Sequence, residues 1–193
     1  MRKAIATITI AAATALAGTA QADAASCGRD AARSVKPGGN SAGGIYTKSE
    51  SERRAGRLAA CLINNQRAAA GVAPLRYNAL LGALANRHTT DLVRHGYANP
   101  DDPHEGSDKS TPETRLRPYI ANFGRSYFRI AETVVDTPTN SPVQAVRWWM
   151  NSPLHRPILL DPALEEVGIA MYAKRVGGGP GGTYTADFGT ARN

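Results

Sequence analysis

The sequence predicts an α+β sandwich built around an antiparallel sheet, and three observations lead to this class. Apolar residues recur at helical spacing in two long segments of the N-terminal half. A β-branched and aromatic segment, residues 127–135, follows a shorter helical pattern and precedes another. Two further extended segments, residues 167–172 and 183–188, flank the glycine-rich turn at 177–182 and predict an antiparallel hairpin. Helices and strands do not alternate strictly, which argues against a doubly wound parallel sheet.

The first long helix is expected to begin at Ser49 or Ser51, because a serine hydroxyl caps the free N–H groups of a helix start. Gly71 and Pro74 end it. The sequence predicts a second helix from about Asn78 to His95, closed by Gly96.

One histidine lies within the apolar stripe of the second helix. His88 falls on the same face as three leucines at helical spacing, Leu81, Leu84 and Leu92. We interpret His88 as a core histidine with satisfied hydrogen bonds and do not assign it a catalytic role.

The remaining elements follow from local start signals. Residues 98–110 form a polar loop, and Ser110 or Thr111 then starts a short third helix with Pro112 in its first turn. Pro142 opens a fourth helix, whose apolar positions are Val143, Val146, Trp149 and Met150.

The N-terminal segment has the pattern of a secretion signal. Arg2 and Lys3 precede an uncharged Ala/Thr-rich run, and small residues allow cleavage after residue 22 or after residue 24. The run is too short and too poor in leucine to span a bilayer, so we expect a secreted, extracellular protein without a transmembrane anchor. Residues 23–49 are an N-terminal arm or linker, and residues 50–193 form one domain.

The charge pattern excludes one class of partner. The net charge is +7, but the basic residues are scattered and aromatic residues are few, so we expect no nucleic-acid partner. We expect the domain to be a monomer.

The chain has two cysteines, Cys27 and Cys61, and both lie beyond the predicted signal. Export makes a disulfide between them the default expectation, and it would tie the N-terminal arm to the first helix. The alternative is two free thiols in an oxidising compartment. Without a third cysteine, neither a cysteine-based metal cluster nor a spare catalytic thiol is expected.

Three polar residues stand at loop or strand positions where they are candidates for chemistry. His104 lies in the polar loop, Glu132 interrupts the extended segment, and His155 follows the Ser152–Pro153 turn. Two imidazoles and a carboxylate match the ligands of a zinc-like cation with an open position, and they equally match a proton-handling group. The spacing alone does not show that the three converge. A loop histidine is usually solvent-exposed and a strand glutamate usually points outward.

From residue 64 to residue 189 the chain resembles the CAP superfamily, also called SCP/PR-1-like, in its bacterial secreted form. The resemblance is carried by NNQRAAAGVAPL (64–75), RHTTDLVRHGY (87–97), AET (131–133), WMNSPLHR (149–156), EVGIA (166–170) and TADFG (185–189).

The resemblance implies a three-layer α-β-α sandwich with one open cleft. By similarity, His104, Glu132 and His155 line that cleft and could hold a divalent cation. Many eukaryotic members carry a second glutamate at the place of Ser152, so the four-residue set is incomplete here and Ser152 is expected to line the cleft. Glycine is replaced at Ala131 and Leu154, and the usual asparagine at Thr133.

We predict that the chain is a secreted, non-catalytic module that binds a ligand or partner, with a cleft able to hold a divalent cation. The partner classes are a small molecule, a lipid, or an extracellular or cell-wall component. One alternative is a metal-assisted, peptidase-like hydrolase that uses His104, Glu132 and His155. Another is a cell-surface interaction domain with a vestigial cleft. No nucleophile elbow, HExxH motif or spare cysteine supports catalysis, so we assign no catalytic residue.

Overall fold

A computed structural model describes Cys27, residues 39–40 and 46–47, and residues 49–99, 101–121 and 128–191. The predicted secretion signal lies outside the described residues, as does most of the N-terminal arm. Within the arm, β1 (Gly39–Asn40) pairs antiparallel with β2 (Tyr46–Thr47). Among the described helices, none is long and apolar enough to cross a membrane.

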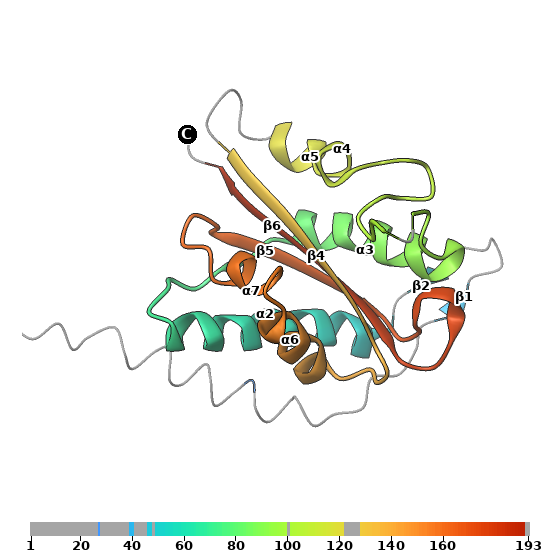
Figure 1. The fold of residues 1–193 in the computed structure, drawn as a ribbon, viewed down its shortest axis with the longest axis horizontal. Coiled ribbons are helices and arrows are strands. Elements are labelled where there is room, and N and C mark those ends of the chain that lie inside the picture. The colour runs from blue at the N-terminus through green and yellow to red at the C-terminus, as the bar shows by residue number, and fades with distance from the viewer. Residues whose placement is uncertain are drawn as a thin grey trace, which may run out of the picture.

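The domain has three layers, with helices on both faces of a four-stranded sheet. Figure 1 shows α2 (Glu50–Ala69), α6 (Pro142–Asn151) and α7 (Arg156–Leu159) on one side of the sheet. The other side carries α3 (Ala79–His95), α4 (Pro112–Arg115) and α5 (Arg117–Ile120). The predicted α+β sandwich is confirmed.

The sheet has the strand order β3-β5-β6-β4. Strands β4 (Phe128–Thr137), β5 (Glu166–Tyr172) and β6 (Gly182–Ala191) pair antiparallel, which confirms the predicted hairpin. A short 3₁₀ turn, Val176–Gly178, joins β5 to β6, and Gly177 and Gly178 supply its positive φ angles of 78° and 89°.

The central strands are antiparallel, as expected, but one edge of the sheet is parallel. The two-residue strand β3 (Arg76–Tyr77) pairs parallel with β5. The amide of Arg76 donates to the Glu165 carbonyl, and the amide of Asn78 donates to the Val167 carbonyl, both at 2.8 Å. Two residues are too few for an alternating pattern, so the parallel strand leaves no periodic signal in the sequence.

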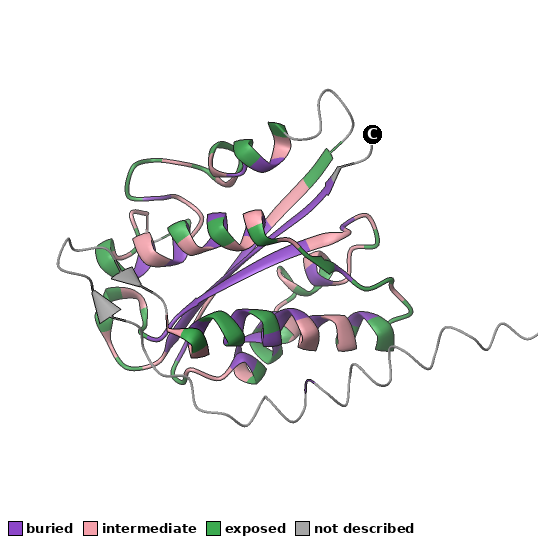
Figure 2. Ribbon diagram, turned by 180° about the vertical axis from the view of Figure 1, so that it is seen from behind, coloured by how far each residue is buried: buried purple, intermediate pink, exposed green. Residues whose placement is uncertain are grey.

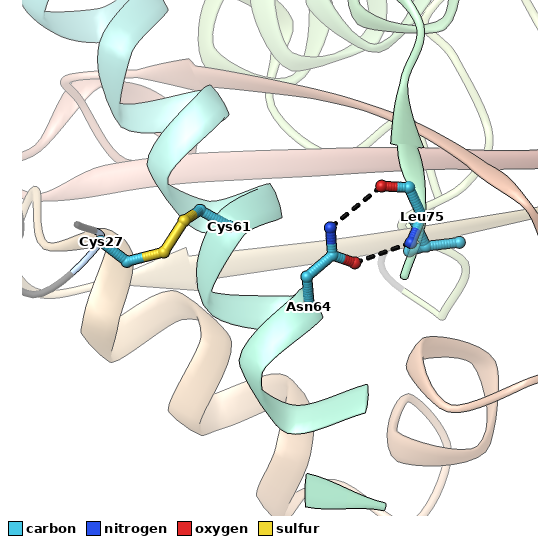
Figure 3. The surroundings of a disulfide bond; sticks show 4 residues. All are labelled: Cys27, Cys61, Asn64 and Leu75. Atoms are coloured by element: carbon cyan, nitrogen blue, oxygen red, sulfur yellow. Dashed lines mark hydrogen bonds between the residues drawn. A yellow bond between two sulfur atoms is a disulfide. The ribbon is translucent and has the colours of Figure 1, made fainter. Parts of the chain in front are cut away.

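Side-chain hydrogen bonds fix the start of α2 and its last turns. Ser49 and Glu52 form a reciprocal capping box at its start. Near its end, the Asn64 amide donates to the Leu75 carbonyl at 2.9 Å and accepts from the Leu75 amide at 2.8 Å (Figure 3). The predicted disulfide between Cys27 and Cys61 is confirmed and joins the arm to the middle of α2 (Figure 3).

A single guanidinium ties α2 to the segment between α7 and β5. Arg67 is buried and donates to backbone carbonyls of Ala73, Leu159, Asp161 and Leu164 at distances of 2.7 to 3.0 Å. The carbonyl dipoles replace the water that the guanidinium loses on burial, and the charge of Asp161 also favours the charged form.

Two hydrophobic clusters fill the space between the layers. The larger packs α2, α6 and α7 against the sheet, around Ile63, Trp149 and Phe188. The smaller lies under α3 and α5, around Leu81, Leu116 and Tyr119. Figure 2 shows the result: strands β5 and β6 are buried along most of their length, and the helices expose only their outer faces.

Candidate functional site

The predicted site residue Glu132 lies in the middle of the edge strand β4, where its side chain is only 1% exposed. It is directly opposite Asp187 of β6, and paired residues of an antiparallel ladder point to the same face. On that face, α3 contributes His88, α4 contributes Arg115, and the loop between these helices contributes His104. We call these five residues the Glu132 cluster.

Both oxygens of the Glu132 carboxylate accept hydrogen bonds. Nη2 of Arg115 donates to Oε1 at 2.9 Å and to Oε2 at 2.7 Å. Nδ1 of His104 lies 2.8 Å from Oε1. Burial acts to raise the pKa of Glu132, but the hydrogen bond from His104 and the charge of Arg115 outweigh it and lower the pKa below its ordinary value. The carboxylate is therefore ionised and fully engaged.

The same contacts fix the orientation of His104. Because its Nδ1 faces an ionised carboxylate, Nδ1 carries a proton, and Nε2 is the ring nitrogen that this contact leaves for another partner. Arg115 also donates to the His104 carbonyl at 3.0 Å and to the Ser110 carbonyl at 2.9 Å, which holds the loop over the sheet edge. The His104 side chain is 31% exposed, so the ring can meet a ligand.

His155 belongs to the opposite layer of the sandwich, beside α7. It lies in a turn, as expected, and is the residue directly before α7, a single turn begun by Arg156 and Pro157. The amide of His155 donates to the Ser152 hydroxyl at 3.3 Å, so Ser152 shapes the turn that carries the histidine. Burial and the nearby charge of His104 lower the pKa of His155. The two imidazoles therefore lie within electrostatic range of each other.

Three members of the cluster were missed as site residues by the sequence analysis. His88 is buried in the core, as predicted, and it also faces Glu132, with 3.6 Å between Nε2 and Oε1. The expectation that its hydrogen bonds are satisfied is wrong at one nitrogen, because Nδ1 is buried without a partner among the described residues. Its Nε2 donates to the Pro103 carbonyl at 3.0 Å, and burial lowers its pKa, so the ring is neutral. Arg115 gives no sequence signal. Asp187 is the one charged residue type within β6, which is unusual for a strand, and it could have been noticed.

The donor set tests the predicted cation site in part. Among the described residues, no group of three or more histidine, cysteine, aspartate or glutamate side chains is placed to hold a metal ion. Glu132 already accepts from Arg115 and His104, so it is better suited to orient His104 than to bind a cation itself. Cation binding by His104 and His155 stays a prediction.

The protonation of Asp187 makes the free energy of unfolding depend on pH. Burial and the negative charge of Glu132 raise its pKa well above the ordinary value, so it stays protonated in the folded chain. Above about pH 4 the unfolded chain releases this proton and the folded chain does not, so stability falls by roughly 1.4 kcal/mol per pH unit until the folded pKa is reached.

Replacing Asp187 with asparagine should therefore raise the free energy of unfolding at pH 7 and leave it nearly unchanged near pH 3. The amide keeps the shape and a donor toward Glu132 but has no proton to lose. Urea unfolding of both chains from pH 3 to pH 8 measures the difference. A gain at pH 3 as large as that at pH 7 would contradict the proton linkage.

The comparisons with known proteins agree with this architecture. The family model described as CAP, Cysteine-rich secretory protein family, matches residues 61–188. An extracellular SCP-domain protein from Bacillus anthracis is similar at 20% identity and a TM-score of 0.58, over 75% of this chain and 45% of that chain. A cysteine-rich secretory protein from Staphylococcus aureus is similar at 21% identity and a TM-score of 0.52, over 75% and 41%.

A third solved structure matches over nearly its whole length. An outer surface protein of Borrelia burgdorferi is 16% identical with a TM-score of 0.57, over 72% of this chain and 95% of that chain. This chain thus spans less than half of the first two structures and almost all of the third. No curated protein matches it. The family match covers most of the described domain, including the whole Glu132 cluster, and the chain belongs to the cysteine-rich secretory protein (CAP) family.

Proposed function

We propose that this chain is an exported CAP domain that binds a ligand or partner without catalysing a reaction, and that His104 and His155 form the contact surface. The observation that carries the proposal is the state of Glu132. Its carboxylate is buried and both oxygens accept charge-assisted hydrogen bonds. It therefore serves to position His104 and is not free to act on a substrate.

The same observation disfavours the hydrolase alternative. A general base must reach the proton it removes and have a pKa near the working pH. Glu132 is shielded from solvent and its pKa is lowered. A nucleophilic thiol is also absent from the described residues, because Cys27 and Cys61 form a disulfide.

Export is supported by two observations. A disulfide persists in an oxidising compartment, and Cys27–Cys61 closes the arm onto α2. The similar proteins from Bacillus anthracis and Borrelia burgdorferi are described as extracellular and outer surface proteins. The candidate secretion signal at residues 1–22 agrees with both.

Two imidazoles would suit a divalent cation of the zinc class, with further ligands from solvent or the partner. Both rings must be neutral to bind it, so we expect binding at about pH 7.5 that weakens as the pH falls below about 6.5. Because the pKa of His155 is lowered, His155 remains neutral to a lower pH than a free histidine. Calorimetric titration with zinc measures this.

Substitution of either His104 or His155 with alanine should weaken zinc binding by at least about tenfold. His95→Ala is the matched control, because its side chain is 59% exposed on α3 and lies outside the cluster. Zinc affinity that is unchanged in both test variants would exclude a shared site. Chelator-sensitive turnover of peptide or ester substrates would favour the hydrolase instead. If the chain binds no cation and responds to no ligand, the cell-surface interaction domain with a vestigial cleft is favoured.

A further inference from the structure

The outer side of α6 carries a hollow of about 510 Å³ that shares no residue with the Glu132 cluster. Such a volume is typical of small-molecule sites, which bury an aromatic or apolar surface beside a few fixed polar groups. Six of its lining residues are polar or aromatic, namely Thr139, Ser141, Gln144, Arg147, Trp148 and Asn151. We propose that this α6 hollow binds an acidic saccharide, a sugar ring that carries a carboxylate.

An exposed indole provides the stacking surface. Trp148 is 47% exposed, whereas the adjacent Trp149 is fully buried and packs edge-on against Tyr184, with ring centroids 6.4 Å apart. Trp149 therefore anchors the helix and Trp148 faces outward from a rigid support. A flat aromatic surface with a polar N–H suits a sugar ring, which has an apolar C–H face and hydroxyls at its rim.

The charge of the hollow selects an anion. Arg147 is exposed and makes no ion pair or hydrogen bond with any residue that the structure describes. Of the side chains that line the hollow, none is a carboxylate, so no lining residue neutralises this cation. A guanidinium binds a carboxylate through two parallel N–H groups, which gives both attraction and orientation.

The flanking amides are placed to bind hydroxyls. Oε1 of Gln144 accepts from the Thr139 hydroxyl at 2.8 Å, which turns the Gln144 NH₂ group away from that contact. Gln144, Arg147, Trp148 and Asn151 follow one another at helical spacing on a single side of α6, so the helix presents them together.

The polar lining also distinguishes this hollow from its neighbour. A second hollow of about 290 Å³ lies between α2 and α6 and shares Val143, Arg147 and Asn151 with the α6 hollow. Its remaining lining is mostly apolar, from Leu62, Val146 and Met150, with one polar side chain, Gln66. An acyl chain would match that apolar surface. The α6 hollow has more polar than apolar lining residues, and a hydroxylated ligand satisfies them better.

Calorimetric titration of the purified chain with three probes tests the proposal. The probes are trigalacturonate, the neutral trisaccharide maltotriose, and octanoate as an acyl carboxylate. We expect trigalacturonate to bind at least about tenfold more tightly than maltotriose at low salt, and the difference to shrink at high salt. A folded chain that does not bind trigalacturonate, or that binds octanoate in its place through Trp148, would overturn the proposal.

Two variants separate stacking from charge. Trp148→Ala should weaken the binding of both saccharides by about tenfold. Arg147→Gln should lower the affinity for trigalacturonate to the affinity for maltotriose. Leu154→Ala and Arg54→Gln are the matched controls, since both residues are exposed and lie outside the hollow, and they should bind as the wild type does. Unchanged binding in both test variants, in chains with an unchanged melting temperature, would show that the saccharide binds elsewhere.

Discussion

Replacing Gly168 with alanine should destabilise the domain by more than about 4 kcal/mol and leave little folded protein. A Cβ atom at this position would lie 1.9 Å from the backbone nitrogen of Gly82 and 2.3 Å from the carbonyl carbon of Leu81. These are backbone atoms of α3, so no side-chain rotation relieves the overlap. The whole helix would have to move away from β5, and the smaller hydrophobic cluster beneath it would open.

Circular dichroism with urea unfolding measures the effect, and Gly179→Ala is the matched control. Gly179 has an ordinary φ of −69° and no heavy atom within 4 Å of a built Cβ, so its substitution should change the free energy of unfolding by less than about 0.5 kcal/mol. A loss below about 1 kcal/mol in the Gly168 variant would mean that α3 is not held against β5 at this point.

The elements that the sequence predicted well are those with local signals. Ser49 and Thr111 cap α2 and α4, and Asn78 and Ser141 cap α3 and α6, each by a side-chain oxygen that accepts from the first turn. A cap and the apolar period after it involve neighbouring residues alone. The start and the buried face of a helix can therefore be inferred without knowing the tertiary fold.

The features that were missed depend on contacts between distant residues. The strand β3 exists because Asn64 holds the α2–β3 turn beside β5, and two residues carry no period of their own. Among the site residues, His104 and Glu132 were predicted and do make contact. Arg115 and Asp187 were not, because their roles arise only when α4 and β6 are packed against β4.

Replacing Arg115 with methionine should lower the free energy of unfolding at pH 7 by about 3 to 5 kcal/mol, because it leaves the buried Glu132 carboxylate without its main cation. Arg53→Met is the matched control. Arg53 pairs with Glu50 at 3.0 Å, but these side chains are 53% and 70% exposed, and such surface pairs contribute about 1 kcal/mol or less. Urea unfolding of both variants gives the loss in free energy of unfolding for a buried and for an exposed Arg–Glu ion pair.

The pH dependence of the Arg115 effect separates charge from packing. In the native chain the pKa of Glu132 is lowered, so its stabilising contribution is present above the unfolded value of about 4.3 and is lost as the pH falls through the folded value. The cost of Arg115→Met should therefore be largest above about pH 5 and shrink toward pH 3, where Glu132 takes up a proton in the folded variant. Combining the change with Glu132→Gln should recover part of the loss at pH 7, because no buried charge then remains unpaired. A cost that is equal at pH 3 and pH 7, with no recovery in the double variant, would assign the role of Arg115 to packing of the His104 loop over β4.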